Sequence, residues 1–293
     1  MYYQGGKKRV GAAIADVIRT LERERFGADA KPRPYYEPFC GMLGVATHMA
    51  QPDRALYASD AHPYVAALWT AWRDGWRPPA DVVVSPDEYR RLREVQARAA
   101  EPTPWLAFVG FAYSHSGVWF RGYGEADAER RRDKSTAAME RTWRRLEQNA
   151  GGERAVRRQL RLRCADYRTA LDGVRNSIIY MDPPYAGTAG YYMPTCAVDG
   201  RARKCQTRVL PFDHAAFWGY VRRLSAPARN NLVLVSEYEA PADFRSVWRK
   251  QLVCPIHNEH NHESSQRVEQ LFVYQAGDGG GEQAAPEQTG HDK

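Results

Sequence analysis

The stretch RNSIIYMDPPYAG, residues 175–187, decides the fold class of this 293-residue chain. Its first half is a run of β-branched and aromatic residues, which is the composition of a buried strand. Pro183 and Pro184 end that strand, because neither can donate a backbone N–H to a sheet. Asp182 directly precedes the prolines and Tyr185 directly follows them. A Pro-rich turn explains the prolines, but it requires neither the acid nor the aromatic ring.

Strands and helices alternate on both sides of this stretch. Apolar residues at helical spacing predict helices, and short β-branched runs predict strands. We expect helices at 9–26, where Gly27 ends the helix, after the glycine turn within 34–50, from about Pro63 to Trp72, and within 210–226. We expect strands at 35–36, in the residues that end at Asp60, at 230–238 and at 268–276. This alternation is typical of an α/β fold with a parallel sheet.

Residues 73–159 interrupt the alternation with Pro-rich turns, charged helices and a Gly/aromatic stretch. We therefore expect one catalytic domain made from 1–72 and 160–275, with 73–159 inserted as a second, mainly helical lobe. Residues 276–293 are rich in Gly, Glu and Pro and poor in apolar residues, which predicts a disordered tail.

The composition excludes several classes of protein. Hydrophobic residues make up 43% of the chain, enough for a sizeable core, yet no apolar run approaches the length of a membrane span. The N-terminus lacks the apolar stretch of a secretory signal, and five scattered Cys indicate reduced thiols. We expect a cytoplasmic protein, or one inside the infected host cell if its source is viral.

The net charge of +7 suggests a polyanionic partner. Between Arg121 and Arg163 the chain carries thirteen Lys and Arg against seven Asp and Glu, so nearly all of the excess lies there. Such a run is either a solvated helical face or a nucleic-acid contact surface.

Acidic residues follow the predicted strands, and ligands of an open parallel sheet bind at the carboxyl ends of its strands. Asp60 could accept two hydrogen bonds from the vicinal hydroxyls of a ribose. The turn with Gly41 and Gly44 either lets backbone approach a cofactor or is only structural. Asp182 and the carbonyl of Pro183 offer two acceptors for the two protons of an exocyclic amine, beside the ring of Tyr185. The pattern predicts a site for an aminated heterocycle.

Seven short motifs occur in order along the chain: YQGGK (3–7), YEPFCG (36–41), SD (59–60), CADY (164–167), DPPY (182–185), LVSEY (234–238) and EQLF (269–272). In sequence and order they resemble the Dam-type S-adenosylmethionine-dependent DNA adenine-N6 methyltransferases, particularly the phage- and virus-borne branch. The likeness spans residues 1 to about 275, with the family's target-recognition insertion before the catalytic tetrapeptide. One position departs from the family: Leu43 stands where a second glycine is usual, and that glycine is displaced to Gly44.

The resemblance implies a Rossmann-like methyltransferase sheet, S-adenosylmethionine as cofactor and double-stranded DNA as partner. It implies methyl transfer to N6 of an adenine that is flipped out of the duplex and stacked on Tyr185. We expect a monomer or weak dimer. The implied catalytic residues are Asp182, Pro183, Pro184 and Tyr185; the implied cofactor-binding residues are Tyr3, Gly6, Lys7, Phe39, Cys40, Gly41, Asp60, Asp166, Tyr167 and again Asp182.

Such a transfer is an in-line displacement, so the enzyme mainly aligns the amine with the methyl group. Acceptors at Asp182 and Pro183 would stabilise the positive charge that develops on the nitrogen. The chain has no Pro-Cys dipeptide, the nucleophile motif of cytosine-C5 methyltransferases; Cys254 precedes its proline. No covalent intermediate is therefore expected.

Residues 109–123 alternate glycines with aromatics and hydroxyls, which fits either a core element or a DNA contact. Arg121 is the main candidate for reading a base, because Arg can pair bidentately with guanine. The Arg-rich helices of 130–163 would contact phosphates or solvent. The predicted nucleic-acid contacts are Lys8, Ser114, His115, Arg121 and Tyr123.

A late cluster, Cys254, His257, His260 and His262, has irregular spacing and no second Cys pair, so we expect a polar loop and no metal. His257-Asn258-Glu259 resembles the start of a zinc-deaminase signature, but the Pro-Cys-x-x-Cys that should follow is missing. Three alternatives stay open: a cytosine-N4 methyltransferase, an RNA adenine methyltransferase, and a catalytically idle DNA-binding regulator. Cytosine-N4 enzymes more often carry Ser at the position of Asp182.

Overall fold

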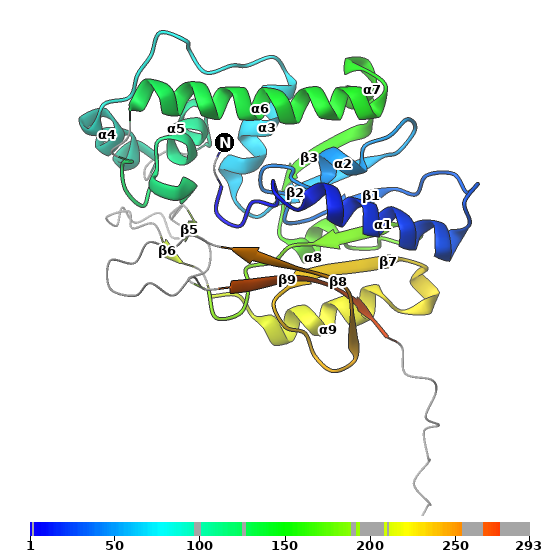
Figure 1. Ribbon diagram of the computed structural model, residues 1–293. Coiled ribbons are helices and arrows are strands. Elements are labelled where there is room, and N and C mark those ends of the chain that lie inside the picture. The colour runs from blue at the N-terminus through cyan, green and yellow to red at the C-terminus, as the bar shows by residue number, and fades with distance from the viewer. Residues whose placement is uncertain are drawn as a thin grey trace, which may run out of the picture.

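The computed structural model describes residues 1, 3–96, 101–124, 127–188, 192–193, 208–209, 211–253 and 266–275. Its centre is a seven-stranded sheet (Figure 1). The strands are β1 (Tyr35–Glu37), β2 (Leu56–Asp60), β3 (Leu160–Cys164), β4 (Ile178–Met181), β7 (Leu232–Glu237), β8 (Phe244–Val253) and β9 (Gln266–Tyr274), in the order β3-β2-β1-β4-β7-β9-β8; β5 (Tyr192–Met193) and β6 (Arg208–Val209) form a separate antiparallel pair.

Five strands of the sheet run parallel, from β3 to β7, and β9 and β8 continue it antiparallel. The sequence moves outward from β1 in both directions, to β2 and β3 on one side and to β4 and β7 on the other. This reversal is the topological switch point, where an open α/β sheet forms its ligand crevice. The predicted α/β class and Rossmann-like sheet are confirmed.

Helices lie on both faces of the sheet (Figure 1). They are α1 (Gly11–Phe26), α2 (Ala46–Met49), α3 (Pro63–Arg73), α4 (Pro86–Gln96), α5 (Pro104–Ala112), α6 (Ala128–Ala150), α7 (Glu153–Gln159), α8 (Tyr167–Ala170) and α9 (His214–Leu224), with 3-10 turns η1 (His115–Gly117) and η2 (Pro227–Arg229). In β4, Ile178 and Tyr180 pack into one core cluster, whereas Ile179 and Met181 pack into the other. A strand buried on both faces explains its uninterrupted apolar sequence.

The predicted helices form close to their expected bounds. Gly27 ends α1 with a φ of 93°, a conformation that glycine adopts without strain. Pro63 is the first residue of α3, where its missing N–H costs no helical hydrogen bond. The Asp213 side chain caps α9 by accepting a hydrogen bond from the Ala216 N–H at 2.9 Å.

The sequence analysis missed two strands, β3 and β8. Strand β3 forms the edge of the sheet and exposes Arg161 and Arg163, so its sequence, LRLRC, lacks the apolar run of a buried strand. Strand β8 lies at the other edge and carries charged residues along FRSVWRKQLV. Edge strands are often charged, because charge blocks unwanted pairing with other chains.

Among the described residues of 73–159 are the helices α4, α5, α6 and α7, joined by turns and loops, and an isolated bridge between Ser114 and Tyr123. Their buried side chains, however, join the same core cluster as one face of the sheet. Hydrogen bonds also tie α6 to α2: Thr47 donates to the Thr142 carbonyl at 3.2 Å, and Asn149 donates to the Thr47 carbonyl at 2.8 Å. The helices of 73–159 therefore cover the sheet directly.

No described helix is both long and apolar enough to cross a bilayer. Cys40 and Cys164 are free thiols. The described residues contain no cluster of three metal-ligating side chains. The tail 276–293 and the cluster of Cys254, His257, His260 and His262 lie outside the described residues.

Candidate active site

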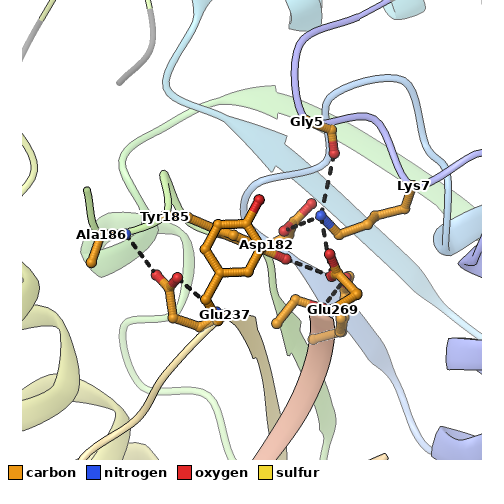
Figure 2. A network of polar contacts seen from close by, with 10 residues as sticks. Gly5, Lys7, Asp182, Tyr185, Ala186, Glu237 and Glu269 are labelled. Carbon is orange, nitrogen blue, oxygen red and sulfur yellow. Dashed lines mark hydrogen bonds and ion pairs between the residues drawn. The ribbon is translucent and has the colours of Figure 1, made fainter. Parts of the chain in front are cut away.

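Asp182 follows β4 at the switch point, and its carboxylate is paired with Lys7 from the N-terminal segment (Figure 2). Lys7 Nζ lies 2.9 Å from Asp182 Oδ1 and 3.4 Å from Glu269 Oε1, and it donates to the Gly5 carbonyl at 3.3 Å. All three charged side chains are at most 11% exposed. The predicted catalytic acid and a predicted cofactor-site lysine are thus in direct contact.

Tyr185 lies against the cluster of Lys7, Asp182 and Glu269. Its hydroxyl donates to Glu269 Oε1 at 2.5 Å, and Lys7 Nζ lies 4.7 Å from the centre of its ring. The ring also meets Tyr238 edge-on, with centroids 4.7 Å apart. Three different segments therefore fix the orientation of the ring: the N-terminus, the end of β7 and β9.

Burial and neighbouring charges shift the titration of this cluster. Burial raises the pKa of Asp182 to about 6, although Lys7 opposes the rise. Burial acts to lower the pKa of Lys7, but the carboxylates of Asp182 and Glu269 outweigh it and raise that pKa. At neutral pH Lys7 is a cation and Asp182 is mostly an anion.

Glu237, the last residue of β7, fixes the backbone that follows the prolines. Its carboxylate accepts the backbone N–H of Ala186 at 3.1 Å and that of Tyr238 at 2.8 Å (Figure 2). Glu237 is 2% exposed, and burial raises its pKa to about 7. It ties the loop after Tyr185 to the end of the neighbouring strand.

Glu37 at the end of β1 is a structural acid in this arrangement. It is 3% exposed, and its carboxylate accepts hydrogen bonds from the Tyr35 hydroxyl, at 2.6 Å, and from the backbone N–H groups of Val45 and Ala46. Burial raises its pKa to about 8. Glu37 therefore connects β1 to the start of α2.

The glycine loop after β1 lies against Asp60 and the N-terminal segment. The Gly41 N–H donates to Asp60 Oδ2 at 3.0 Å, and the His62 N–H donates to Asp60 Oδ1 at 2.8 Å. A Cβ at Gly41 would come within 2.8 Å of the Tyr3 ring, and Gly41 has a φ of +42°. Glycine is therefore required for Tyr3 to pack there. Burial raises the pKa of Asp60 to about 6.

Leu43, the residue before Gly44 in this loop, adopts a φ of 55°. This left-handed conformation costs an L-residue roughly 1 kcal/mol. The Leu43 side chain is fully buried in the core, which compensates for that cost. The loop thus keeps a glycine-like backbone without the glycine.

The CADY motif begins at Cys164, the last residue of β3, and its residues Asp166 and Tyr167 differ in exposure. Asp166 is exposed and caps α8 by accepting the Arg168 N–H at 2.9 Å. Tyr167 is 3% exposed, and its ring stacks on Phe39 with centroids 5.5 Å apart. Cys40 is 4% exposed and points into the other core cluster. Tyr167 and Phe39 form an aromatic wall beside the loop.

The structure separates the predicted nucleic-acid residues into buried and exposed ones. Ser114 is 1% exposed, and its hydroxyl bonds to Tyr89 and to the Gly110 carbonyl, each at 2.6 Å. Tyr123 is half-buried and donates to the Val84 carbonyl at 2.7 Å. Exposed members are Lys8, His115 and Arg121.

The aromatic residues of 109–123 form a core element, one of the two alternatives for this stretch. Tyr113 and Phe120 are fully buried and Trp119 is 2% exposed. A Cβ at Gly110 would lie 2.2 Å from the Trp119 ring, so the glycine makes room for that indole. These rings therefore position the exposed turn around His115 and Arg121.

Helix α6 carries a basic stripe, which we define as Arg130, Lys134, Arg141, Arg144 and Arg145. These exposed residues recur at intervals that place them on one helical face, opposite the buried Met139, Trp143 and Leu146. Within the described chain, Lys134, Arg141 and Arg144 make no ion pair. A shallow cavity of about 390 Å³ lies beside this helix, against Pro78 and Ala80, and no residue of the Asp182 cluster lines it.

Sequence reasoning gave no role to Glu269 or Glu237, which lie in the strand-like runs VEQLFVY and NNLVLVSEY. The available signal was a carboxylate within or at the end of an apolar strand. Burying such a carboxylate costs free energy, so its presence predicts a specific hydrogen-bond or ion-pair partner.

No protein-family model and no curated protein matches this chain. Among solved structures, the crystal structure of SMU.472, titled a putative methyltransferase complexed with SAH, aligns with 11% identity and a TM-score of 0.28. The alignment covers 93% of this chain and 55% of that one, so this chain spans about half the length of that protein. Similarity this low supports no functional inference, and the assignment rests on the site.

Proposed function

We propose that this protein is a DNA methyltransferase that uses S-adenosylmethionine to methylate N6 of a flipped adenine in duplex DNA. The observation that carries the proposal is Asp182: a buried, mostly ionised carboxylate at the switch point, followed directly by Pro183, Pro184 and Tyr185. This position is where an open α/β sheet binds its ligand.

The residues present fit S-adenosylmethionine. Asp60 is half-buried at the end of β2, and each of its oxygens accepts one backbone N–H, which leaves lone pairs for ribose hydroxyls. The site holds two carboxylates, Asp182 and Glu269, and one ammonium, Lys7. Its formal net charge is therefore negative, which suits a sulfonium cation. When bound, the cofactor supplies the methyl group.

The chain's own residues then act on the amine. Asp182 Oδ1 is paired with the Lys7 ammonium, so Oδ2 is the oxygen that accepts a hydrogen bond from one N6 proton. The Pro183 carbonyl accepts the other proton, and both acceptors favour the charge that develops on nitrogen. Tyr185 supplies an aromatic surface against which the base stacks. Glu237 holds the backbone after Tyr185 in place.

DNA contacts are proposed at the exposed residues Lys8, His115 and Arg121, and at the basic stripe of α6. Buried Ser114 and half-buried Tyr123 would act by holding the turn that presents His115 and Arg121. Arg121 is the candidate for base reading, and the stripe is the candidate for phosphate contacts.

The test is transfer of labelled methyl groups to mixed-sequence duplex DNA by the purified protein. Wild type is expected to label the DNA, and Asp182→Ala is expected to abolish labelling while DNA binding persists. Cofactor binding without labelling of any DNA would contradict the proposal and favour the idle regulator.

The cofactor assignment has its own test. Asp60→Ala is expected to raise the dissociation constant of S-adenosylmethionine, measured by calorimetry, because the ribose loses its acceptor. Asp127→Ala, which removes the exposed side-chain cap of α6, serves as the comparison. An unchanged constant in Asp60→Ala would contradict the ribose contact.

A further inference from the structure

We propose that Glu269 is a positioning residue of this site, which holds the Tyr185 ring and the Lys7 ammonium in the arrangement that Asp182 needs. The inference rests on the proposed function and adds a residue from β9, a strand that follows the catalytic tetrapeptide by more than eighty residues. Glu269 acts through its two partners and not on the base.

Burying the carboxylate of Glu269 costs free energy. Glu269 is 3% exposed, and the Asp182 side chain is 11% exposed. These two carboxylates share one ammonium, that of Lys7. One carboxylate would neutralise Lys7, and a second buried charge costs free energy that a structural ion pair does not require. A need to hold two side chains in place accounts for the second carboxylate.

Each N–H donor of the Lys7 ammonium has a partner in this cluster. Lys7 has three N–H bonds and three partners, Asp182, Glu269 and the Gly5 carbonyl. The ammonium is therefore a fixed link between the two carboxylates and not a donor to substrate. Glu269 also accepts the Tyr185 hydroxyl through the same oxygen, Oε1, at 2.5 Å.

Tyr185 is restrained at both its hydroxyl and its ring. Its hydroxyl is held by Glu269, and its ring meets Tyr238 edge-on at an interplanar angle of 88°. Without Glu269, Tyr185 would keep only the interaction of its side chain with Asp182 and the contacts of its face and edge. The base-stacking surface would then lose its fixed orientation toward Asp182, and near-attack geometry would become less populated.

The test compares Glu269→Gln, which keeps the side chain's size, with Tyr185→Phe, which keeps the ring. Each is expected to slow single-turnover methyl transfer on bound DNA by roughly tenfold to hundredfold, the range for one hydrogen bond to a charged group. The dissociation constant of the cofactor should stay within about twofold, because a positioning role leaves binding intact. The matched control is Glu153→Gln, which breaks an exposed ion pair with Arg157.

A double-mutant cycle with Glu269→Gln and Tyr185→Phe tests whether Glu269 acts through Tyr185. If Glu269 acts through Tyr185, the double variant is no slower than the slower single variant. Additive losses, or wild-type turnover in Glu269→Gln, would overturn the proposal.

A second readout does not depend on activity. In protein labelled with 3-fluorotyrosine, the ¹⁹F resonance of Tyr185 is assigned by its absence in Tyr185→Phe. It is expected to shift in Glu269→Gln and to stay in place in Glu153→Gln. An unchanged resonance in Glu269→Gln would overturn the proposal. If wild type methylates no DNA, the proposed function fails, and this resonance still decides whether Glu269 holds Tyr185.

Discussion

Replacing Lys7 by Met tests whether its ammonium keeps Asp182 ionised. Lys7 Nζ lies 2.9 Å from Asp182 Oδ1, and burial has already raised the pKa of Asp182 to about 6. An opposite charge at this distance typically lowers the pKa of a carboxyl group by about 1–3 units. Its removal is expected to raise the pKa of Asp182 to roughly 8.

The magnitude follows from the ionised fraction. With a pKa of about 6, Asp182 is about nine-tenths ionised at pH 7. With a pKa of roughly 8, only about one tenth is ionised. The ionised carboxylate is the form that accepts a hydrogen bond from N6. Methyl transfer by Lys7→Met should therefore be about tenfold slower than by wild type at pH 7. The rate should recover as the pH rises above about 8.

Other titratable groups also face Asp182: Glu269 from β9, Glu237 from β7, Glu37 from β1, and Tyr180 and Tyr185 from its own segment. The charge of Glu269 acts to raise the pKa of Asp182, in the same direction as the loss of Lys7. The direction is unaffected, since a neighbouring carboxylate also raises the pKa.

The assay is the single-turnover rate of methyl transfer from about pH 5.5 to 9.5 for wild type, Lys7→Met and Lys8→Met. Lys8 is the matched control, because it is the adjacent lysine and is exposed. Its variant should keep the wild-type midpoint. If Lys7→Met also kept that midpoint, the electrostatic role of Lys7 would be refuted.

Three further predictions concern the loop, the sheet and the helix. Both Leu43→Gly and Leu43→Ala should destabilise the protein in urea unfolding, with Gly the more stable by roughly 1 kcal/mol because only Ala keeps the left-handed strain; the reverse order would contradict this. Burial raises the pKa of Glu37 to about 8, so the stability that protonated Glu37 contributes is lost as the pH rises from about 4.5 to 8. The unfolding free energy of Glu37→Gln should therefore decline less over this pH range than that of wild type. An equally steep decline in the variant would contradict this prediction. Replacing Lys134, Arg141 and Arg144 by Gln should weaken DNA binding and reduce the slope of log K against log salt by roughly 2–3, whereas an unchanged slope would assign the stripe to solvent.

The elements that were predicted correctly are those whose sequence reflects burial. Strand β4 is apolar on both faces, and α3 starts at a proline, so each carries a local signal. Strand β3 carries exposed Arg161 and Arg163, and an edge strand of this kind has no apolar run to reveal it. Its pairing with β2 is a tertiary effect that local propensity does not encode.

The candidate site was only partly predictable for a related reason. Asp182 and Tyr185 flank two prolines, so they could be found by local pattern alone. Glu269 contacts Tyr185 across 84 residues of sequence, and such a contact follows only from the sheet order. For Ser114, the composition of its segment did not distinguish a hydroxyl facing DNA from one bonded within the core.

The most direct test of the account is the identity of the nucleoside that the protein modifies. Duplex DNA incubated with wild type and a methyl-labelled donor would be digested to nucleosides and analysed by mass spectrometry, with Asp182→Asn in parallel. The account predicts label in N6-methyladenine for wild type and none for Asp182→Asn. Label in N4-methylcytosine, or label that persists at the wild-type level in Asp182→Asn, would contradict it.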